Sequence, residues 1–265
     1  MRTIAVVNQK GGCGKTTTAI NTAAALAGMA KRVLLIDLDP QAHATMGLGC
    51  NPDALCKTIY DVMTDNQTPL STIITGTNIE WLDLAPCNVL LAGGELQLSN
   101  RPQKESLLAR KLQTLNGRYP FCIIDCPPAL GNLTLNALMA STDVIVPVQV
   151  HYYALEGLKR LLETIRIIRG RFPSCSLDVL GLLLTFVEER TIFSRQIQQQ
   201  MRRLFGDLVF NTVIHKSLRL AEAPSASESI FTYAPQSRGA ADYRSLAEEI
   251  LYDNVWAEEM THAKI

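Results

Sequence analysis

The chain has 265 residues, a formal net charge of 0 at pH 7, 47% hydrophobic residues and 19% charged residues. These values exclude a disordered chain, and they exclude binding to DNA or anionic lipid through overall charge, so such binding needs a local patch. The 7 cysteines form no Cys-x-x-Cys pair and no apolar run reaches the roughly 20 residues of a membrane span, so we expect a cytoplasmic protein with reduced thiols.

Apolar segments typical of buried strands alternate with amphipathic segments typical of helices. The predicted strands span 4–8, 32–37, 79–85, 121–125, 143–148 and 178–186, and the predicted helices span 15–29, 103–116, 132–140, 154–170 and 191–205. This alternation predicts an α/β fold, with a mostly parallel, twisted sheet flanked by helices on both faces. We expect a single domain over 1–265, although length alone also permits two smaller ones. Residues 41–78 are the least regular segment, and they follow the second predicted strand, where a functional loop would lie.

The first predicted strand leads through a glycine-rich loop into a helix, which is the setting of a phosphate-binding loop. Residues 9–17 read QKGGCGKTT. Glycines let consecutive backbone N–H groups face phosphate oxygens, and the helix N-terminus adds its dipole. We therefore predict that Lys15 contacts the β- and γ-phosphates of ATP and that the Thr16 hydroxyl binds Mg²⁺. The predicted ATP-binding residues are Lys10, Gly11, Gly12, Cys13, Gly14, Lys15, Thr16 and Thr17.

This loop departs from the usual phosphate-loop spacing. Gln9 stands where a glycine is usual, and an additional lysine, Lys10, follows it. A second ammonium group close to a triphosphate has an anionic partner, which favours a role in nucleotide binding. The alternative is a glycine-rich turn with solvated lysines.

Three aspartates follow apolar runs that are predicted to be parallel strands. Asp37 and Asp39 lie at the end of the second strand, and Asp125 ends the segment FCIID. The carboxyl ends of parallel strands are where open α/β sheets bind ligands. We expect Asp125 to hold the hydration shell of Mg²⁺, with Asp37 near the metal. Taken singly, each aspartate also fits a cap or a turn.

Positive charge gathers in residues 190–219. This segment contains six basic residues and one acidic residue, Asp207, which gives a local charge of +5. Arg195, Arg202 and Arg203 share one face of a predicted helix. Aromatic residues do not interleave with the basic ones in a pattern that suggests base stacking, so we expect contacts to phosphates without sequence readout. A solvated helix face is the alternative. The predicted DNA-binding residues are Arg190, Arg195, Arg202, Arg203, Lys216 and Arg219.

The C-terminal segment 244–265 is acidic. Five acidic residues against Arg244 and Lys264 give it a charge of −3, so anionic lipid would repel it. We expect Leu246, Ile250 and Leu251 to pack this segment onto the domain, and we expect no membrane partner.

Several segments resemble the ParA/MinD superfamily of deviant Walker A ATPases, and in particular its short, Soj-like ParA branch. They are KGGCGKT (10–16), IDLDPQ (36–41), IIDCPPALG (123–131), VPVQVHYYALEGL (146–158), LRLAEAPS (218–225) and SRGAADYRSLAEEI (237–250). The resemblance implies that Lys10 is catalytic and reaches the nucleotide of a second subunit, with Gly11 at the dimer contact. It further implies that Lys10, Lys15 and Asp39 are the catalytic residues and that Asp39 orients the attacking water. Arg219 matches a position that binds DNA in this family.

The resemblance also implies a function. ATP and Mg²⁺ would close a homodimer that binds DNA non-specifically on the nucleoid, and slow hydrolysis, stimulated by a ParB-like protein, would return it to the monomer. Such a cycle segregates chromosome or plasmid DNA. His215 and Ser217 depart from the proline and asparagine common in the family near the adenine. The first strand begins near residue 3, so we expect no helix-turn-helix extension before it.

Three other functions use the same nucleotide site. The ATPase can position another cargo, such as a microcompartment or a chemoreceptor cluster, on the nucleoid. A MinD-like membrane regulator of division is disfavoured by the acidic C-terminal segment. An iron–sulfur relative would need a cysteine shared across a dimer, and Cys126 is better interpreted as a small packed thiol.

Overall fold

A computed structural model describes residues 1–265 except 99–101, 116, 151–153, 173–174 and 263–265; the side chains of 154–156 and 253–262 also lie outside the described part. Its strands are β1 (Arg2–Val6), β2 (Val33–Asp37), β3 (Thr75–Gly76), β4 (Leu82–Ala85), β5 (Phe121–Asp125), β6 (Asp143–Gln149), β7 (Asp178–Val187) and β8 (Val209–His215). They form one sheet in the order β3-β4-β2-β5-β1-β6-β7-β8. Every neighbouring pair is parallel except β3 with β4. The predicted single α/β domain with a mostly parallel sheet is therefore confirmed.

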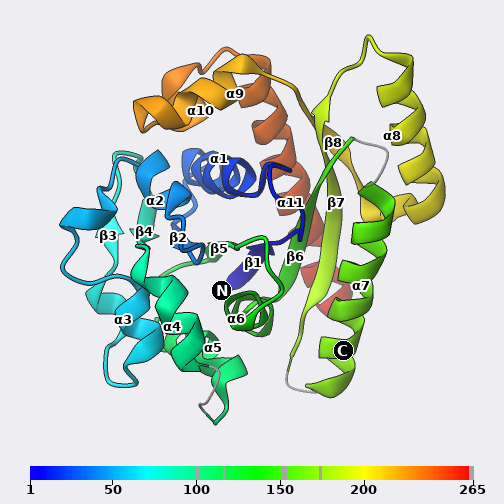
Figure 1. Ribbon diagram of the computed structural model, residues 1–265. Coiled ribbons are helices and arrows are strands. Elements are labelled where there is room, and N and C mark those ends of the chain that lie inside the picture. The colour runs from blue at the N-terminus through cyan, green and yellow to red at the C-terminus, as the bar shows by residue number, and fades with distance from the viewer. Residues whose placement is uncertain (99–101, 116, 151–153, 173–174, 263–265) are drawn as a thin grey trace.

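Helices cover both faces of this sheet, as predicted (Figure 1). They are α1 (Lys15–Gly28), α2 (His43–Gly47), α3 (Ile59–Thr64), α4 (Leu90–Leu98), α5 (Leu107–Gln113), α6 (Asn132–Ala140), α7 (Ala154–Arg171), α8 (Ile192–Phe205), α9 (Leu218–Glu222), α10 (Ile230–Tyr233) and α11 (Arg238–His262). Short 3₁₀ turns lie at Pro52–Ala54, Leu70–Thr72, Lys104–Ser106, Gly206–Leu208 and Ala223–Ala226. Among the helices in the described part of the chain, none is both long and apolar enough to cross a bilayer.

The strands bury both of their faces, which explains why their sequences are almost continuously apolar. On one face, Ile4 and Val6 of β1 pack with Ala23 and Leu26 of α1 and with residues of α11. On the other face, Ala5 packs into a second core that α3 to α7 complete (Figure 1). Two hydrophobic cores therefore hold the sheet rigidly from both sides and fix the positions of the loops at its carboxyl edge.

The structure contains several elements that the sequence pattern did not predict. Residues 41–78 contain α2, α3, two 3₁₀ turns and β3 rather than one loop, and α3 begins with a capping box between Thr58 and Asp61. Strand β8 was not predicted, because Asn211 and Thr212 interrupt its apolar pattern at the edge of the sheet. Edge strands bury less of their surface, so their sequences carry a weaker signal.

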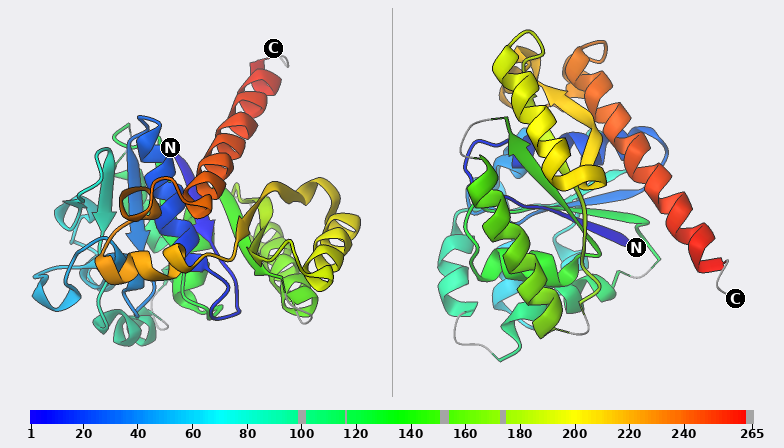
Figure 2. Two further views of the ribbon diagram at one scale, coloured as in Figure 1. Left: turned by 90° about the horizontal axis from the view of Figure 1, so that it is seen from above. Right: turned by 90° about the vertical axis from the view of Figure 1, so that its right-hand side faces the viewer.

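Helix α11 closes that edge. The Glu249 carboxylate accepts the backbone N–H groups of Asn211 and Thr212 at 2.7 and 2.9 Å. Leu246 and Ile250 are fully buried and Leu251 is half-buried against the same core, which confirms that they pack this helix onto the domain. Figure 2 shows β8 lying between α8 and α11. The acidic side chains at 253, 258 and 259, and Lys264, lie outside the described residues.

Candidate functional site

The loop between β1 and α1 is shaped for phosphate. Gly12 and Gly14 have φ angles of 72° and 89°, in the left-handed region that glycine adopts without strain. A Cβ atom at Gly11 or Gly12 would meet nothing within 4 Å, so the loop surface there is open. Lys15 and Thr16 then begin α1, where unpaired helical N–H groups and the dipole favour an anion.

The two lysines of the loop face different surroundings. Lys15 is buried, and its Nζ donates to the backbone carbonyl of Lys10 at 3.2 Å. Lys10 is exposed, and its Nζ donates to the side-chain oxygen of Gln149 at 3.0 Å. Lys15 thus lies inside its own loop, whereas Lys10 extends across the carboxyl ends of β1 and β6.

Residues outside the motif hold the loop in place. Asn8 accepts the N–H of Lys10 at 3.0 Å and donates to the carbonyl of Pro147 at 2.6 Å. From β7, the Thr185 hydroxyl donates to the carbonyl of Cys13 at 2.9 Å. Cys13 is fully buried, and burial raises the pKa of its thiol, so it packs as an uncharged group. No sequence signal marked Thr185, because its contact with the loop joins segments that are distant in the chain.

The sheet register brings two aspartates together. Asp37 and Asp125 end neighbouring strands and are direct register partners, and both are fully buried. Asp37 is held by its surroundings: its carboxylate accepts the N–H and hydroxyl of Thr45 at 2.8 and 2.7 Å and the N–H of Asp39 at 3.2 Å. Burial raises the pKa of Asp37 to about 6 against these hydrogen bonds.

Asp125 differs because neither of its oxygens has a hydrogen-bond partner among the described residues. Burial, followed by the Asp37 carboxylate, raises its pKa well above the usual range. The Thr16 hydroxyl and the Lys15 ammonium group oppose this shift from nearby, although Thr16 does not reach hydrogen-bond geometry. A buried, unpaired carboxylate is costly, and a cation bound beside Thr16 would satisfy it. The residues present therefore fit a magnesium site.

A hollow of about 420 Å³ lies over the loop. Asp39, the third predicted aspartate, is one of its lining residues and is 7% exposed; its Oδ1 accepts the N–H of Gln41 at 3.0 Å. The hollow is also lined by residues 11, 12 and 14–17 and by Gln41, His43, Pro128 and Phe186. The structure thus brings Asp39 to the same space as Lys15 and Thr16, where a carboxylate can orient a water molecule.

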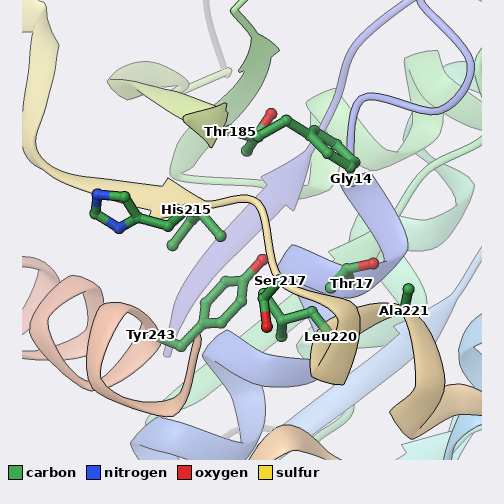
Figure 3. A pocket seen from close by; sticks show the side chains of 10 residues that line it. Gly14, Thr17, Thr185, His215, Ser217, Leu220, Ala221 and Tyr243 are labelled. Atoms are coloured by element: carbon green, nitrogen blue, oxygen red, sulfur yellow. The ribbon is translucent and has the colours of Figure 1, made fainter. Parts of the chain in front are cut away.

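A second, smaller pocket of about 180 Å³ adjoins this hollow. Figure 3 shows that its side chains come from separate segments: Thr17 from α1, Thr185 from β7, Tyr243 from α11, and Ser217, Leu220 and Ala221 at α9. The lining is mostly apolar, which suits the flat face of a nucleobase. Gly14, Thr17 and Phe186 line both spaces, so the two lie side by side, and we refer to them together as the groove.

His215 and Ser217, which depart from the family pattern, both line the smaller pocket. The His215 ring points away from Gly14 and Thr17 in Figure 3. Its Nδ1 lies 3.0 Å from the Asp242 carboxylate and its Nε2 3.0 Å from that of Glu189, which Arg238 also contacts at 2.7 Å. His215 is the last residue of β8, and both of its ring nitrogens have carboxylate partners.

The predicted DNA-binding residues lie on α8, on α9 and beside the carboxyl ends of β7 and β8. On α8, Arg202 donates to the carbonyl of Asn211 at 3.2 Å. Lys216 forms an ion pair with Glu188, and Arg219 forms one with Glu222 at 3.0 Å. Within the described residues, no ion pair involves Arg190, Arg195 or Arg203. Acidic residues just outside 190–219 therefore lower the local charge expected from that segment alone.

Comparison with known proteins agrees with this geometry. A family model described as an AAA domain matches residues 1–176. The chain is 45% identical over 247 residues to the sporulation initiation inhibitor protein Soj of Bacillus subtilis, covering 93% of this chain and 97% of Soj. It is 40% identical over 251 residues to the chromosome partitioning protein ParA of Myxococcus xanthus, covering 94% and 88%. It is also similar to a solved cobyrinic acid a,c-diamide synthase from Mycobacterium smegmatis with bound ADP and magnesium (36% identity, TM-score 0.83, 95% and 94% coverage).

Proposed function

The chain belongs to the Soj and ParA family of P-loop ATPases, and from this premise we propose that it is a partition ATPase that dimerises on ATP and then binds DNA without sequence preference. The observation that supports this proposal most directly is the different placement of the two loop lysines. Lys15 lies inside its own loop, and Lys10 is exposed with its ammonium group at the open carboxyl edge of the sheet. A monomer leaves Lys10 without a phosphate partner, whereas a second subunit would supply one.

In the proposed cycle, ATP lies along the groove with its base in the pocket beside Ser217 and its phosphates over the loop. Lys15 and the N–H groups of the loop hold the β- and γ-phosphates. Thr16 and Asp125 would hold Mg²⁺, with Asp37 near it; the ion neutralises phosphate charge when bound. Asp39 orients the attacking water. The proposed turnover is slow, because a carboxylate such as that of Asp39 is a weak base.

Loss of the γ-phosphate removes the partner that Lys10 reaches across the interface, so hydrolysis opens the dimer. DNA binding follows the same cycle, because two subunits present twice the number of arginines to the phosphate backbone. The names of the Soj and ParA relatives support chromosome partition, and a ParB-like protein that accelerates hydrolysis is the partner we propose.

Substitution of the two lysines separates nucleotide binding from dimerisation. We expect Lys15→Ala to weaken ATP binding by more than about 100-fold, because the substitution removes the ammonium group that pairs with phosphate inside the loop. Lys10→Ala should bind ATP as the wild type does but remain monomeric with ATP in light scattering after size exclusion. Lys31→Ala, an exposed lysine after α1, is the matched control and should behave as wild type. ATP-dependent dimers of Lys10→Ala would contradict the role given to Lys10.

A further inference from the structure

Phe186 has an unusual backbone at the carboxyl end of β7. Its φ angle is 55°, in the left-handed region that aromatic residues rarely adopt. The strand pairing shows the cause: Leu184 pairs with Val213 and Val187 with His215, so β7 advances three residues while β8 advances two. The extra residue is a β-bulge, and bulges next to functional sites redirect a side chain.

The bulge presents the Phe186 ring at the surface. Thr185 and Val187 on either side are 2% exposed, whereas Phe186 is 41% exposed. The ring does not extend freely into solvent, because its Cε2 atom would lie 3.6 Å from a Cβ atom built at Gly14. A strained backbone and an exposed aromatic ring are both unfavourable for stability alone, and strain of this kind gathers at ligand sites.

The position of the ring relative to the groove identifies what it would contact. The phosphate hollow and the base pocket share three lining residues, Gly14, Thr17 and Phe186. In a nucleotide the sugar joins the base to the phosphates, so a nucleotide that fills both spaces carries its sugar past these three residues. Of them, Phe186 has the only large apolar side chain.

We propose that Phe186 is a nucleotide-binding residue whose ring packs against the sugar of the bound nucleotide. The proposal rests on the nucleotide site described above and adds a contact outside the phosphate loop. It explains why the chain keeps an aromatic residue where glycine would fit the backbone without strain. The ring acts on ligands that contain a nucleoside and not on phosphate alone.

The test compares Mg-ADP with Mg-pyrophosphate by titration calorimetry, because ADP is not hydrolysed and pyrophosphate lacks sugar and base. We expect Phe186→Ala to weaken ADP binding about tenfold, because the apolar ring surface no longer covers the sugar, and to leave pyrophosphate binding unchanged. Phe193→Ala removes another exposed ring, 47% exposed on α8 and outside both pockets, and should bind both ligands as wild type does.

Phe186→Gly separates the ring from the backbone. Glycine accepts the left-handed conformation, so this variant should melt at a higher temperature than Phe186→Ala and show the same decrease in ADP affinity. Unchanged ADP affinity in both variants would overturn the proposal, and so would an equal decrease for ADP and pyrophosphate, which would indicate a distorted loop. A wild-type protein that binds neither ligand would instead contradict the proposed function.

Discussion

Lys10 and Lys15 lie in one loop, but only the ammonium group of Lys15 is hydrogen-bonded to that loop. The helix start buries Lys15 and turns its Nζ to the Lys10 carbonyl, while the exposed Lys10 side chain contacts Gln149 on β6. The difference follows from position, because a residue at the first turn of α1 points back over the loop and a residue before the glycines does not. The same chemical group therefore has two different surroundings within one loop.

Asp125 carries the clearest energetic cost at the residue scale. Its carboxylate is fully buried and has no hydrogen-bond partner among the described residues, while its equally buried neighbour Asp37 accepts three hydrogen bonds. A buried group without a partner costs about 1–3 kcal/mol. Without nucleotide and metal the protein retains that cost, and binding would relieve it.

We expect Asp125→Asn to raise the melting temperature of the nucleotide-free protein by roughly 2–6 °C, because an uncharged amide costs less to bury than a carboxylate. The folded-state pKa of Asp125 is raised, so the wild-type carboxyl group is neutral and tolerated at low pH and becomes destabilising as the pH rises through that pKa. The difference in melting temperature between Asp125→Asn and the wild type should therefore increase from acid to neutral pH.

Asp37→Asn is the matched control, because it neutralises an equally buried carboxylate that has partners. Its melting temperature should lie below that of Asp125→Asn, because burial also raises the pKa of Asp37 but Thr45 would lose its charged acceptor. A nucleotide-free Asp125→Asn protein that melts below wild type would contradict the account of Asp125. Asp125→Asn should also gain less stability from ADP and magnesium than the wild type does.

At the scale of elements, the basic surface combines α8 and α9 with the ends of β7 and β8. Its cations are not equally available: Lys216 and Arg219 are paired with Glu188 and Glu222, and Arg203 has no ion pair within the described residues. A phosphate must therefore displace a carboxylate from two of the six predicted DNA-binding residues. Exposed ion pairs are worth about 0–1 kcal/mol each, so this competition is modest.

Glu188→Gln should release Lys216 and raise affinity for random-sequence duplex DNA about two- to fivefold at low salt, measured by fluorescence anisotropy with ATP. Glu163→Gln, an exposed glutamate on α7, makes the same change in net charge and is the control. It should leave the affinity unchanged. Equal gains in both variants would indicate a general charge effect and remove Lys216 from the contact surface.

At the scale of the whole molecule, the proposed cycle links nucleotide binding to DNA binding through dimer assembly. The nucleotide groove opens at the carboxyl edge of the sheet, and the end of β7 contributes both Thr185, which holds the loop, and the segment that leads into α8. Two rigid cores connect these regions, so closure of a dimer at one end would fix the relative position of two basic surfaces.

Salt dependence measures the number of phosphate contacts in each state. The slope of log affinity against log salt concentration is about −0.9 per neutralised phosphate on duplex DNA. We expect the ATP-bound wild-type protein to show about twice the slope of ATP-bound Lys10→Ala, because the dimer doubles the surface. Equal slopes would mean that one subunit makes all of the contacts, and dimerisation would then not control DNA binding.

The sequence by itself determined the phosphate loop, the aspartates at strand ends, the parallel sheet and the family, because these features are local. A strand–loop–helix motif is contiguous, and a strand buried on both faces must be apolar throughout. The burial of Leu246 and Ile250 also followed from periodicity. Edge strand β8 and the short helices in 41–78 did not, since weak burial and short length leave little pattern in the sequence.

Only the tertiary structure decided which distant residues meet. The strand order sets Asp37 beside Asp125, brings Thr185 to Cys13, and places Glu188 against Lys216. It also decided that a bulge in β7 turns Phe186 toward the groove. These contacts depend on how two packed cores align the strands, and that alignment is a property of the whole fold rather than of any one segment.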